Sequence, residues 1–567
     1  MAVKINFNEA AAQTHTALIR NERAMNKSLL RMSTGMRILS AADDSAGMFI
    51  ADMLSTVAKA YEQGNRNIST GISALQIAEA SAGQIFDKLQ EIYVRAQNAA
   101  NDVNDPNARM ALQREIMNFV DAIQKIGTDT EYNGIRLLDG SFAGKYIHYG
   151  PRMDQTVSIS ISDVRAQSLG AYIASGNGGT ATGVSSTAGG SLAVLLSGTG
   201  SLGGATNHIL SENDYVRIAD ITVYRGGTTN TLVDAATLAK NINENEQMKK
   251  LQIEAKAKNI SLANQYSNVI TGTFSYTGSE TSDSANFTAT IDLRFYIGDG
   301  QKTFTVNLGS VAGTASGDTS TTSNFTSTAL ADLDTLVNRI NTAATANNAN
   351  VTAINDNGRL KLVTKNGETI AIEARVNYAE SETNSGTISA NITVDLGQLL
   401  QGADYTTISS TTNAITYYAA VKTGQIEIGG IDSFKLEYNG VSGTTDNNYG
   451  LYFQIASGNN VSLQSLYNID VTTNEGAEKA IMITSKALQK ADTERAKIGA
   501  VMNNLQTIFD AQKVAFDNTK EAESVIRNTD YAKEMADFTT YQIRMQATVA
   551  MLAQANTLPQ LMLQLLR

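Results

Sequence analysis

Several residue types that carry chemistry in other proteins are missing or scarce in this chain of 567 residues. It contains no cysteine and no tryptophan, and only three histidines and three prolines. The absence of cysteine excludes disulfides and thiolate sites, and three histidines leave little for metal binding or general-base catalysis. No catalytic constellation is visible elsewhere in the sequence. We therefore expect neither an enzyme nor a bound cofactor or metal.

Positive charge is also in short supply. The chain has 44 lysines and arginines against 55 acidic residues, a net charge of -11, which argues against a nucleic-acid partner. The first residues lack the cationic start and apolar run of a cleaved secretory signal. The one candidate membrane span, 545–566, contains Gln, Asn and Pro residues that are costly in hydrocarbon, so we expect no span.

Both ends of the chain carry apolar patterns with helical spacing. No charged side chain occurs between Arg544 and Arg567, and Pro559 is expected to end or kink the last helix. Six positions of this stretch share one helix face: Phe538, Tyr541, Met545, Thr548, Leu552 and Ala555. A further apolar residue, Leu565, follows the proline. A seam close to the coiled-coil period lies near the N-terminus: Leu18, Met25, Leu29, Met32, Met36. We predict that the two termini pair, and that copies of the pair associate between molecules. The alternative is that both are ordinary core helices of one domain.

Further helices are expected before residue 130. The first helix should run through Arg31–Arg37 and reach Ser40–Gly47, although Gly35 and Gly47 weaken it. Apolar spacing predicts a second helix over 68–89 and a third over 106–126, after the break at Asn104–Pro106. Four polar residues are candidates for inter-subunit or turn contacts: Arg31, Arg37, Asp43 and Asp44. The two carboxylates suit capping or an ion pair with either arginine, and a solvated turn is the alternative.

The middle of the chain differs from the ends in composition and in its hydrophobic pattern. Turn pairs occur at Asn133–Gly134 and Asp139–Gly140, and 157–161 alternates as a half-buried strand does. From about 176 to 450 the chain is rich in Gly, Ser, Thr and Asn, with short strand-like runs at 216–224, 293–297, 304–308, 360–364 and 425–428. A G-x-G-x-x-G match at 198–203 lies in this low-complexity sequence without a good helix behind it, so we do not expect a dinucleotide site.

An internal repeat lies within the middle segment. Asp234–Asn243 matches Asp332–Asn341, with Asp, Thr, Leu, Ile and Asn in register. This predicts two α/β modules, near 216–255 and 304–364. The fold class is α+β: a long α-helical coiled-coil hairpin core formed by both termini, with β-rich outer insertion domains. We expect three parts: 1–43 with 524–567, 44–175 with 470–523 including a β-hairpin, and the insertion 176–469.

Several of these runs resemble bacterial flagellins. They are Arg31–Gly47, Thr130–Gly140, Asp530–Ala532, Ala553–Asn556, Pro559–Gln560 and Leu565–Arg567. The resemblance covers about 1–170 and 475–567, and the Ile-Asn repeat is similar to a module of some flagellin and hook-associated insertions. It implies a secreted structural subunit of the extracellular flagellar filament, with the terminal helices as its inner core. The nearest alternative is a hook–filament junction protein.

The resemblance also implies partners. These are further copies of the chain, the hook–filament junction proteins, the filament cap, the type III export apparatus and an export chaperone on the C-terminus. Flagellins sensed by Toll-like receptor 5 carry closely spaced arginines followed by a glutamate in the helix around Leu89. Here Arg95 stands alone and Glu91 precedes it, so we expect weak recognition or none.

Overall fold

The computed structural model describes residues 7–101, 103–185, 192, 208–267, 269–278, 284–316, 321–326, 332–383, 387–410, 414–444 and 447–565. The chain divides into two compact units. The first comprises Met1–Gln84, Ile126–Val164 and Thr493–Arg567, and the second comprises Ile85–Lys125 and Arg165–Asp492. The predicted α+β fold class is confirmed, since long helices from both termini flank a β-rich middle.

Long helices form both ends of the sequence. They are α1 (Glu9–Thr34), α2 (Ser45–Ala99), α3 (Pro106–Asp129), α8 (Asn474–Arg527) and α9 (Tyr531–Leu565). The prediction that the first helix continues through Arg37 is wrong, because α1 ends at Thr34. Gly35 adopts the left-handed conformation with φ of 69° and donates its N–H to the Arg31 carbonyl. Glycine takes this conformation at no steric cost, which makes it an effective helix terminator.

The two chain segments that follow α1 and precede α9 pair with each other. The Thr529 N–H donates to the Gly35 carbonyl at 2.9 Å, and the Arg37 N–H donates to the Arg527 carbonyl at 2.8 Å. Met36 and Asn528 form an antiparallel bridge between these bonds. The break in both helices therefore leaves few backbone groups unpaired.

Two small β-hairpins belong to the same unit. Strands β1 (Glu131–Tyr132) and β2 (Ile135–Arg136) join through the predicted Asn133–Gly134 turn, and β3 (Lys145–His148) pairs with β4 (Thr156–Ile159). The second hairpin packs on α2 where that helix carries Gly64 and Gly71. A Cβ on Gly64 would lie 1.8 Å from the Tyr149 carbonyl oxygen, and one on Gly71 would lie 2.0 Å from Ile147. The two glycines thus provide the space that the hairpin occupies.

The second unit contains the large antiparallel sheets. A six-stranded sheet has the order β16 (Val351–Asp356), β17 (Arg359–Thr364), β11 (Glu254–Gln265), β22 (Gln425–Gly430), β5 (Gly170–Gly176), β27 (Leu463–Ser465). A five-stranded sheet has the order β14 (Lys302–Ser316), β13 (Ser284–Ile297), β18 (Ile370–Thr383), β21 (Ala414–Lys422), β6 (Thr180–Ser185). One four-stranded sheet has the order β15 (Thr321–Thr326), β12 (Ile270–Thr277), β19 (Thr387–Asp395), β20 (Tyr405–Ser410).

Smaller sheets complete this unit. A four-stranded sheet has the order β26 (Asn459–Asn460), β23 (Lys435–Asn439), β8 (Tyr215–Ile218), β9 (Ile221–Arg225). The remaining pairs are β7 (Ile209–Leu210) with β10 (Thr231–Leu232), and β24 (Ser442–Thr444) with β25 (Asn447–Gly450). The predicted run 216–224 is a hairpin and not one strand, because Ala219 and Asp220 turn the chain with φ of 48° and 64°.

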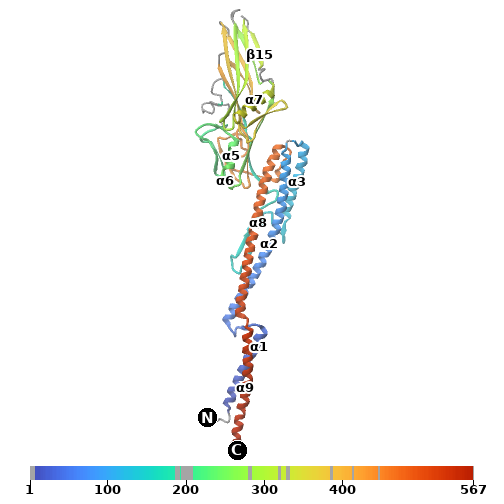
Figure 1. Ribbon diagram of the computed structural model, residues 1–567, viewed down its shortest axis with the longest axis vertical. Helices are drawn as coiled ribbons and strands as arrows, with labels where there is room; N and C mark the ends of the chain where they lie inside the picture. Colours follow the sequence, from blue (N-terminus) through green and yellow to red (C-terminus); the bar gives the residue numbers. More distant parts are fainter. Residues whose placement is uncertain are drawn as a thin grey trace. The chain divides into compact units, whose positions relative to one another are not determined.

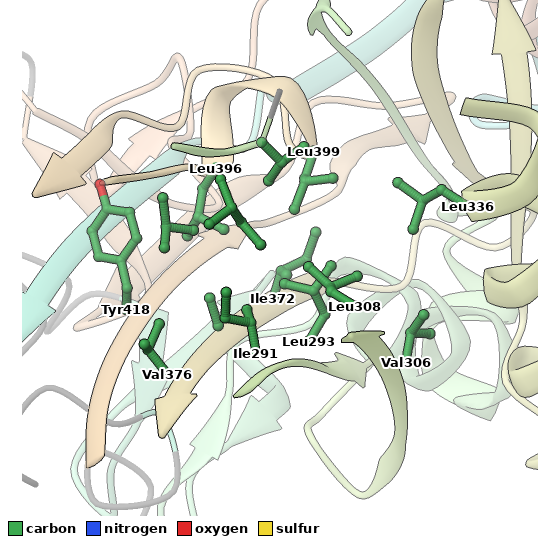
Figure 2. Close-up of a cluster of buried hydrophobic side chains, with 14 of the residues drawn as sticks. Ile291, Leu293, Val306, Leu308, Leu336, Ile372, Val376, Leu396, Leu399 and Tyr418 are labelled. Atoms are coloured by element: carbon green, nitrogen blue, oxygen red, sulfur yellow. The ribbon is translucent and has the colours of Figure 1, made fainter. Parts of the chain in front are cut away.

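A large apolar core holds the long strands together. It joins the inward faces of β13, β14, β18 and β21 with helix α7 (Leu333–Ala346) and the 3-10 helix η4 (Leu396–Gln398). Figure 2 shows these side chains turned toward one another, among them Leu293, Leu308 and Leu336. Burial of so many aliphatic groups gives the unit its own stability.

The internal repeat corresponds to two helices held by the same clamp. Helices α5 (Ala235–Glu244) and α7 each begin after an aspartate that accepts a backbone N–H. The short helix α6 (Glu246–Lys250) follows α5. Asn243 donates from Nδ2 to the Ala255 carbonyl at 2.8 Å and accepts the Ala255 N–H at 2.9 Å. Asn341 makes the same two bonds to Ala353, at 2.9 and 2.8 Å. The repeated asparagine thus bonds a helix to the strand that follows it.

Replacement of Asn341 by alanine should release strand β16 from α7. The change removes both bonds to the buried Ala353 backbone, and each unpaired buried group costs about 1–3 kcal/mol. Hydrogen exchange of the Ala353 amide in the full chain should accelerate. Asn338→Ala, at an exposed position of the same helix, is the matched control and should leave that amide protected. Equal acceleration in both variants would contradict the clamp.

Candidate assembly surface

Helices α1 and α9 lie side by side and run in opposite directions (Figure 1). Their register is fixed by polar contacts along the pair. Asn8 donates from Nδ2 to the Ala555 carbonyl at 2.9 Å, and Ser28 donates from Oγ to the Glu534 carbonyl at 3.2 Å. The two termini are therefore one structural element, as the apolar patterns predict.

Pro559 lies inside α9 and does not end it, because the helix continues to Leu565. The first of the two predicted effects, a helix end, is therefore wrong. A proline has no N–H to give to the carbonyl four residues earlier, which is that of Ala555. The Asn8 side chain donates to this same carbonyl, while its Oδ1 accepts the Ala11 N–H at 3.1 Å and caps α1. One side chain thus starts the first helix and satisfies the acceptor that Pro559 leaves open.

The facing sides of the two helices contain most of the residues expected to pack there. Ser28 is buried between the helices, and its small side chain permits a close approach. The half-buried positions are Leu18, Met25 and Met32 on α1, and Phe538, Tyr541, Met545, Thr548 and Leu552 on α9. Ala555 is buried as well. Leu565 ends α9, and its side chain lies outside the described residues.

Other apolar side chains of the pair are exposed to solvent in the part of the chain that the structure describes. Leu29 and Met36, which belong to the expected seam, are 52% and 37% exposed. On α9, Ile543 is 61% exposed and lies two residues from both Tyr541 and Met545, which places it on the opposite side of the helix. Ala536 and Ala550, each seven residues from Ile543, are exposed too. Heptad spacing of small and apolar residues is typical of a helix-packing seam.

The four polar candidates make separate contacts within the chain. Arg31 lies 3.8 Å from Glu534, and Arg37 donates from Nη2 to the Ile526 carbonyl at 2.7 Å. Asp43 forms an ion pair with Lys27, and Asp44 accepts the Gly47 N–H at 2.9 Å and starts α2. Asp43 therefore holds the linker that follows α1, and Asp44 holds the start of α2.

The electrostatic surroundings of Asp43 favour its charged form. Lys27 has the largest effect, and the backbone N–H groups of Leu39 and Ser40 also donate to the carboxylate, each at 3.2 Å. Together they lower the pKa of Asp43 to about 2. The carboxylate therefore stays ionised under all but strongly acidic conditions.

The residues expected at an innate-receptor surface lie on α2. Leu89 is fully buried. Arg95 is held by two carboxylates, Glu91 at 3.2 Å on its own helix and Glu115 at 2.9 Å on α3. The single arginine of this stretch is thus already paired within the chain.

Three other kinds of site were considered in the sequence: a membrane span, a metal site and a dinucleotide site. Among the described residues, no helix is long and apolar enough to cross a bilayer. The same residues contain no cluster of three His, Asp or Glu side chains placed to hold a metal ion. The G-x-G-x-x-G match at 198–203 lies outside the described residues.

Three contributors to the terminal pair were not predicted: Asn8, Ser28 and Ile543. Asn8 precedes Glu9 as an N-cap residue does, so a capping signal was present in the sequence. Ser28 and Ile543 carry no local signal, because their roles depend on which side of each helix faces the other.

Substitution of Asp43 by asparagine should loosen the linker after α1. A carboxylate with a lowered pKa stabilises the native state above its unfolded value of about 3.9, and this contribution is lost as pH falls toward 2. At neutral pH, Asp43→Asn should accelerate hydrogen exchange of the Leu39 and Ser40 amides. Asp44→Asn keeps a capping side chain and should leave those amides unchanged. A carboxyl titration of Asp43 near 4 in the wild-type chain would contradict the assignment.

The chain is similar in sequence to known flagellar proteins. Residues 5–143 match the family model of the bacterial flagellin N-terminal helical region, and residues 481–566 match that of the C-terminal helical region. The flagellin of Aquifex pyrophilus is 44% identical over the full length of both chains, as is that of Aquifex aeolicus. The B-type flagellin of Pseudomonas aeruginosa is 29% identical over the same extent.

Solved structures give weaker matches. FliC from Burkholderia pseudomallei shares 28% identity over 21% of this chain and 48% of its own, with a TM-score of 0.18. The flagellar junction protein FlgL from Legionella pneumophila shares 10% identity over 84% of this chain and 99% of its own, with a TM-score of 0.29. The full-length sequence relatives decide the assignment, and the alternative of a hook–filament junction protein is not adopted. The chain belongs to the bacterial flagellins, the structural subunits of the flagellar filament.

Proposed function

We propose that the pair formed by α1 and α9 is the polymerising element of the chain, and that it assembles by coupled folding and association. The observation that carries this proposal is the uncovered apolar side of the pair, above all Ile543 opposite the half-buried face of α9. Leu29, Leu30 and Met36 extend it on α1. A second helix pair of the same kind would cover these groups.

The energetics favour ordering on assembly. An isolated helix is marginal in water, and two helices that only half-bury their contact residues gain little from each other. Each leucine or isoleucine that becomes fully buried between copies contributes about 1.5–3 kcal/mol. These contributions act against the entropy of fixing the chain. The contact is heterologous and does not close on itself, so it propagates as a helical filament.

The proposed arrangement of the chain follows from this element. Residues 1–43 and 524–567 form the inner core, and 44–175 with 470–523 form the next helical shell. The insertion 176–469 faces outward and carries the two clamped modules. Independent apolar cores in that insertion support its placement outside the polymerising region.

Partners are assigned from the same surface. The apolar side of α9 suits an export chaperone before secretion through the flagellar type III apparatus, and suits junction and cap proteins at the filament ends. As a subunit of the filament, the chain lies outside the cell. We assign it no catalytic activity, in keeping with its lack of cysteine and its three histidines.

Recognition by Toll-like receptor 5 should be weak. Glu91 and Glu115 already engage two nitrogens of the Arg95 guanidinium, and a receptor carboxylate would have to compete with both of them. Purified chain applied to receptor-bearing reporter cells should activate them only at high concentration. Potent activation would refute this expectation.

Ile543→Asp should abolish filament formation without unfolding the chain. The new carboxylate would be buried unpaired between copies, at a cost of several kcal/mol, whereas Ile543 is 61% exposed in the single chain. Sedimentation and electron microscopy under assembly conditions should show filaments for the wild type and none for the variant.

The matched control is Ile354→Asp, the same replacement at a position 43% exposed on strand β16 of the insertion. It should assemble as the wild type does. If Ile543→Asp also forms filaments, the polymerising side of α9 is assigned wrongly. If the control fails as completely, a general effect of added charge explains the result.

A further inference from the structure

Five asparagines of the chain are followed directly by glycine. They are Asn133, Asn177, Asn357, Asn366 and Asn439. Because glycine has no side chain to shield its own backbone nitrogen, this nitrogen can reach Cγ of the preceding asparagine. Asparagine is also one of the thermolabile residues. The structure separates one of the five pairs, that of Asn133 with Gly134, from the other four.

The pair of Asn133 and Gly134 forms the turn of the small hairpin β1–β2. Asn133 has φ of 51° and Gly134 has φ of 75°, and both residues are exposed. Among the described residues, no hydrogen bond holds the Asn133 carboxamide or the Gly134 N–H. A Cβ on Gly134 would have no heavy atom within 4 Å. The two reacting groups are therefore accessible and unconstrained by neighbours.

The hairpin is short enough to open locally. Only two residue pairs form it: Glu131 with Arg136, and Tyr132 with Ile135. Two-stranded hairpins are marginally stable in water. At the base of the hairpin, the Leu137 N–H donates to the Thr130 carbonyl at 3.1 Å, and Leu137 is buried. The turn can therefore change its backbone conformation while its base stays anchored.

Two of the other pairs have an engaged glycine nitrogen. The Gly178 N–H donates to the Leu451 carbonyl at 3.1 Å, and the Gly358 N–H donates to Oδ1 of Asn355 at 2.9 Å. A Cβ on Gly178 would lie 2.5 Å from the Thr423 carbonyl oxygen, so the backbone there is closely packed. Each nitrogen must lose its hydrogen bond before it can attack the preceding side chain.

The remaining two pairs have an engaged asparagine side chain. Nδ2 of Asn366 donates to Oε1 of Glu368 at 3.0 Å, and Nδ2 of Asn439 donates to the Asn213 carbonyl at 3.1 Å. The glycine that follows each asparagine packs against another segment and has no room for a Cβ. Both carboxamides are thus held in one orientation on a closely packed backbone.

We propose that Asn133 is a site of spontaneous deamidation, at which the Gly134 nitrogen attacks Cγ of Asn133 and forms a cyclic imide. The Gly134 N–H gives its proton to hydroxide, a bond forms between this nitrogen and Cγ, and the bond between Cγ and Nδ2 breaks. Nδ2 takes a proton from water and leaves as ammonia. Water then adds to either imide carbonyl and gives aspartate or isoaspartate. The whole reaction consumes one water and needs no oxidant.

The products change the turn of the hairpin. Both add a negative charge two residues from Glu131, and isoaspartate also adds one carbon to the backbone. A two-residue hairpin loop has a fixed length, with φ above zero at both positions in its commonest form. Isoaspartate therefore breaks the pairing of Glu131 with Arg136, while the buried Leu137 keeps its place. This reaction takes place within the single chain and does not depend on assembly.

The first test is peptide mapping by mass spectrometry of the full chain after incubation in mildly alkaline buffer. Exchange of the carboxamide for a carboxylate changes the peptide mass, and a protein-isoaspartate methyltransferase labels the isoaspartate. Asn133 should be converted about tenfold faster than any of the other four, because each of those must first lose a hydrogen bond. The rate should rise with pH, since the attacking nitrogen is deprotonated. Asn133→Gly should remove the signal. Equally fast conversion at another pair would overturn the proposal.

The same incubation in denaturant separates the effect of the fold from that of the sequence. All five pairs consist of the same two residues, so their conversion rates should converge once the chain is unfolded. If Asn133 keeps the same lead in denaturant, the fold does not select it and the proposal is overturned.

A matched variant tests the protection at another pair. Asn355→Ala removes the acceptor of the Gly358 N–H. Asn357 should then be converted about fivefold faster, as expected for the loss of one hydrogen bond. Asn133 in the same molecule should keep its rate and serves as the internal standard. An unchanged rate at Asn357 would overturn the physical reason for which Asn133 is selected.

Discussion

The antiparallel contact between α1 and α9 is the interaction on which the rest of the structure depends. It joins residues more than 500 positions apart, so the element forms only when both ends of the chain are present. The pair buries one side of each helix and leaves the other uncovered. A helix pair with this distribution is marginal by itself and gains its stability from further copies. This is the basis on which we propose that the terminal pair polymerises.

The linkers next to α1 and α9 have stabilising contacts of their own. Gly35 ends α1 without strain, Asp43 ties the following turn to Lys27, and paired backbone groups join the two linker segments. The β-rich unit depends on none of these contacts, because it has apolar cores of its own. A chain with separate sources of stability can keep its β-rich insertion ordered independently of the terminal pair.

Buried polar groups in the insertion fall into two kinds. The asparagines of the repeated modules are neutral at any pH, and each satisfies both backbone groups of one residue in the next strand. His208 also holds a backbone group, the Gly450 N–H at 3.4 Å from Nε2, but it can take up a proton. The asparagine contacts are therefore independent of pH, whereas burial lowers the pKa of the His208 ring to about 4.

The sequence by itself determined the long-range plan of the protein. Helical spacing of apolar residues located both terminal helices, strict alternation and turn pairs located the β-rich middle, and the repeated Asp and Asn positions located α5 and α7. These signals are local, since each arises from the period of one element or from one cap. The sequence misjudged Gly35, Pro559 and the run 216–224, where backbone freedom or a distant side chain outweighed the local pattern. Only the tertiary structure showed that Asn8 satisfies the carbonyl left open by Pro559, that Ile543 faces away from α1, and that Gly450 donates to His208. Each of these facts joins segments that are distant in the chain, and no local period encodes which of their faces meet.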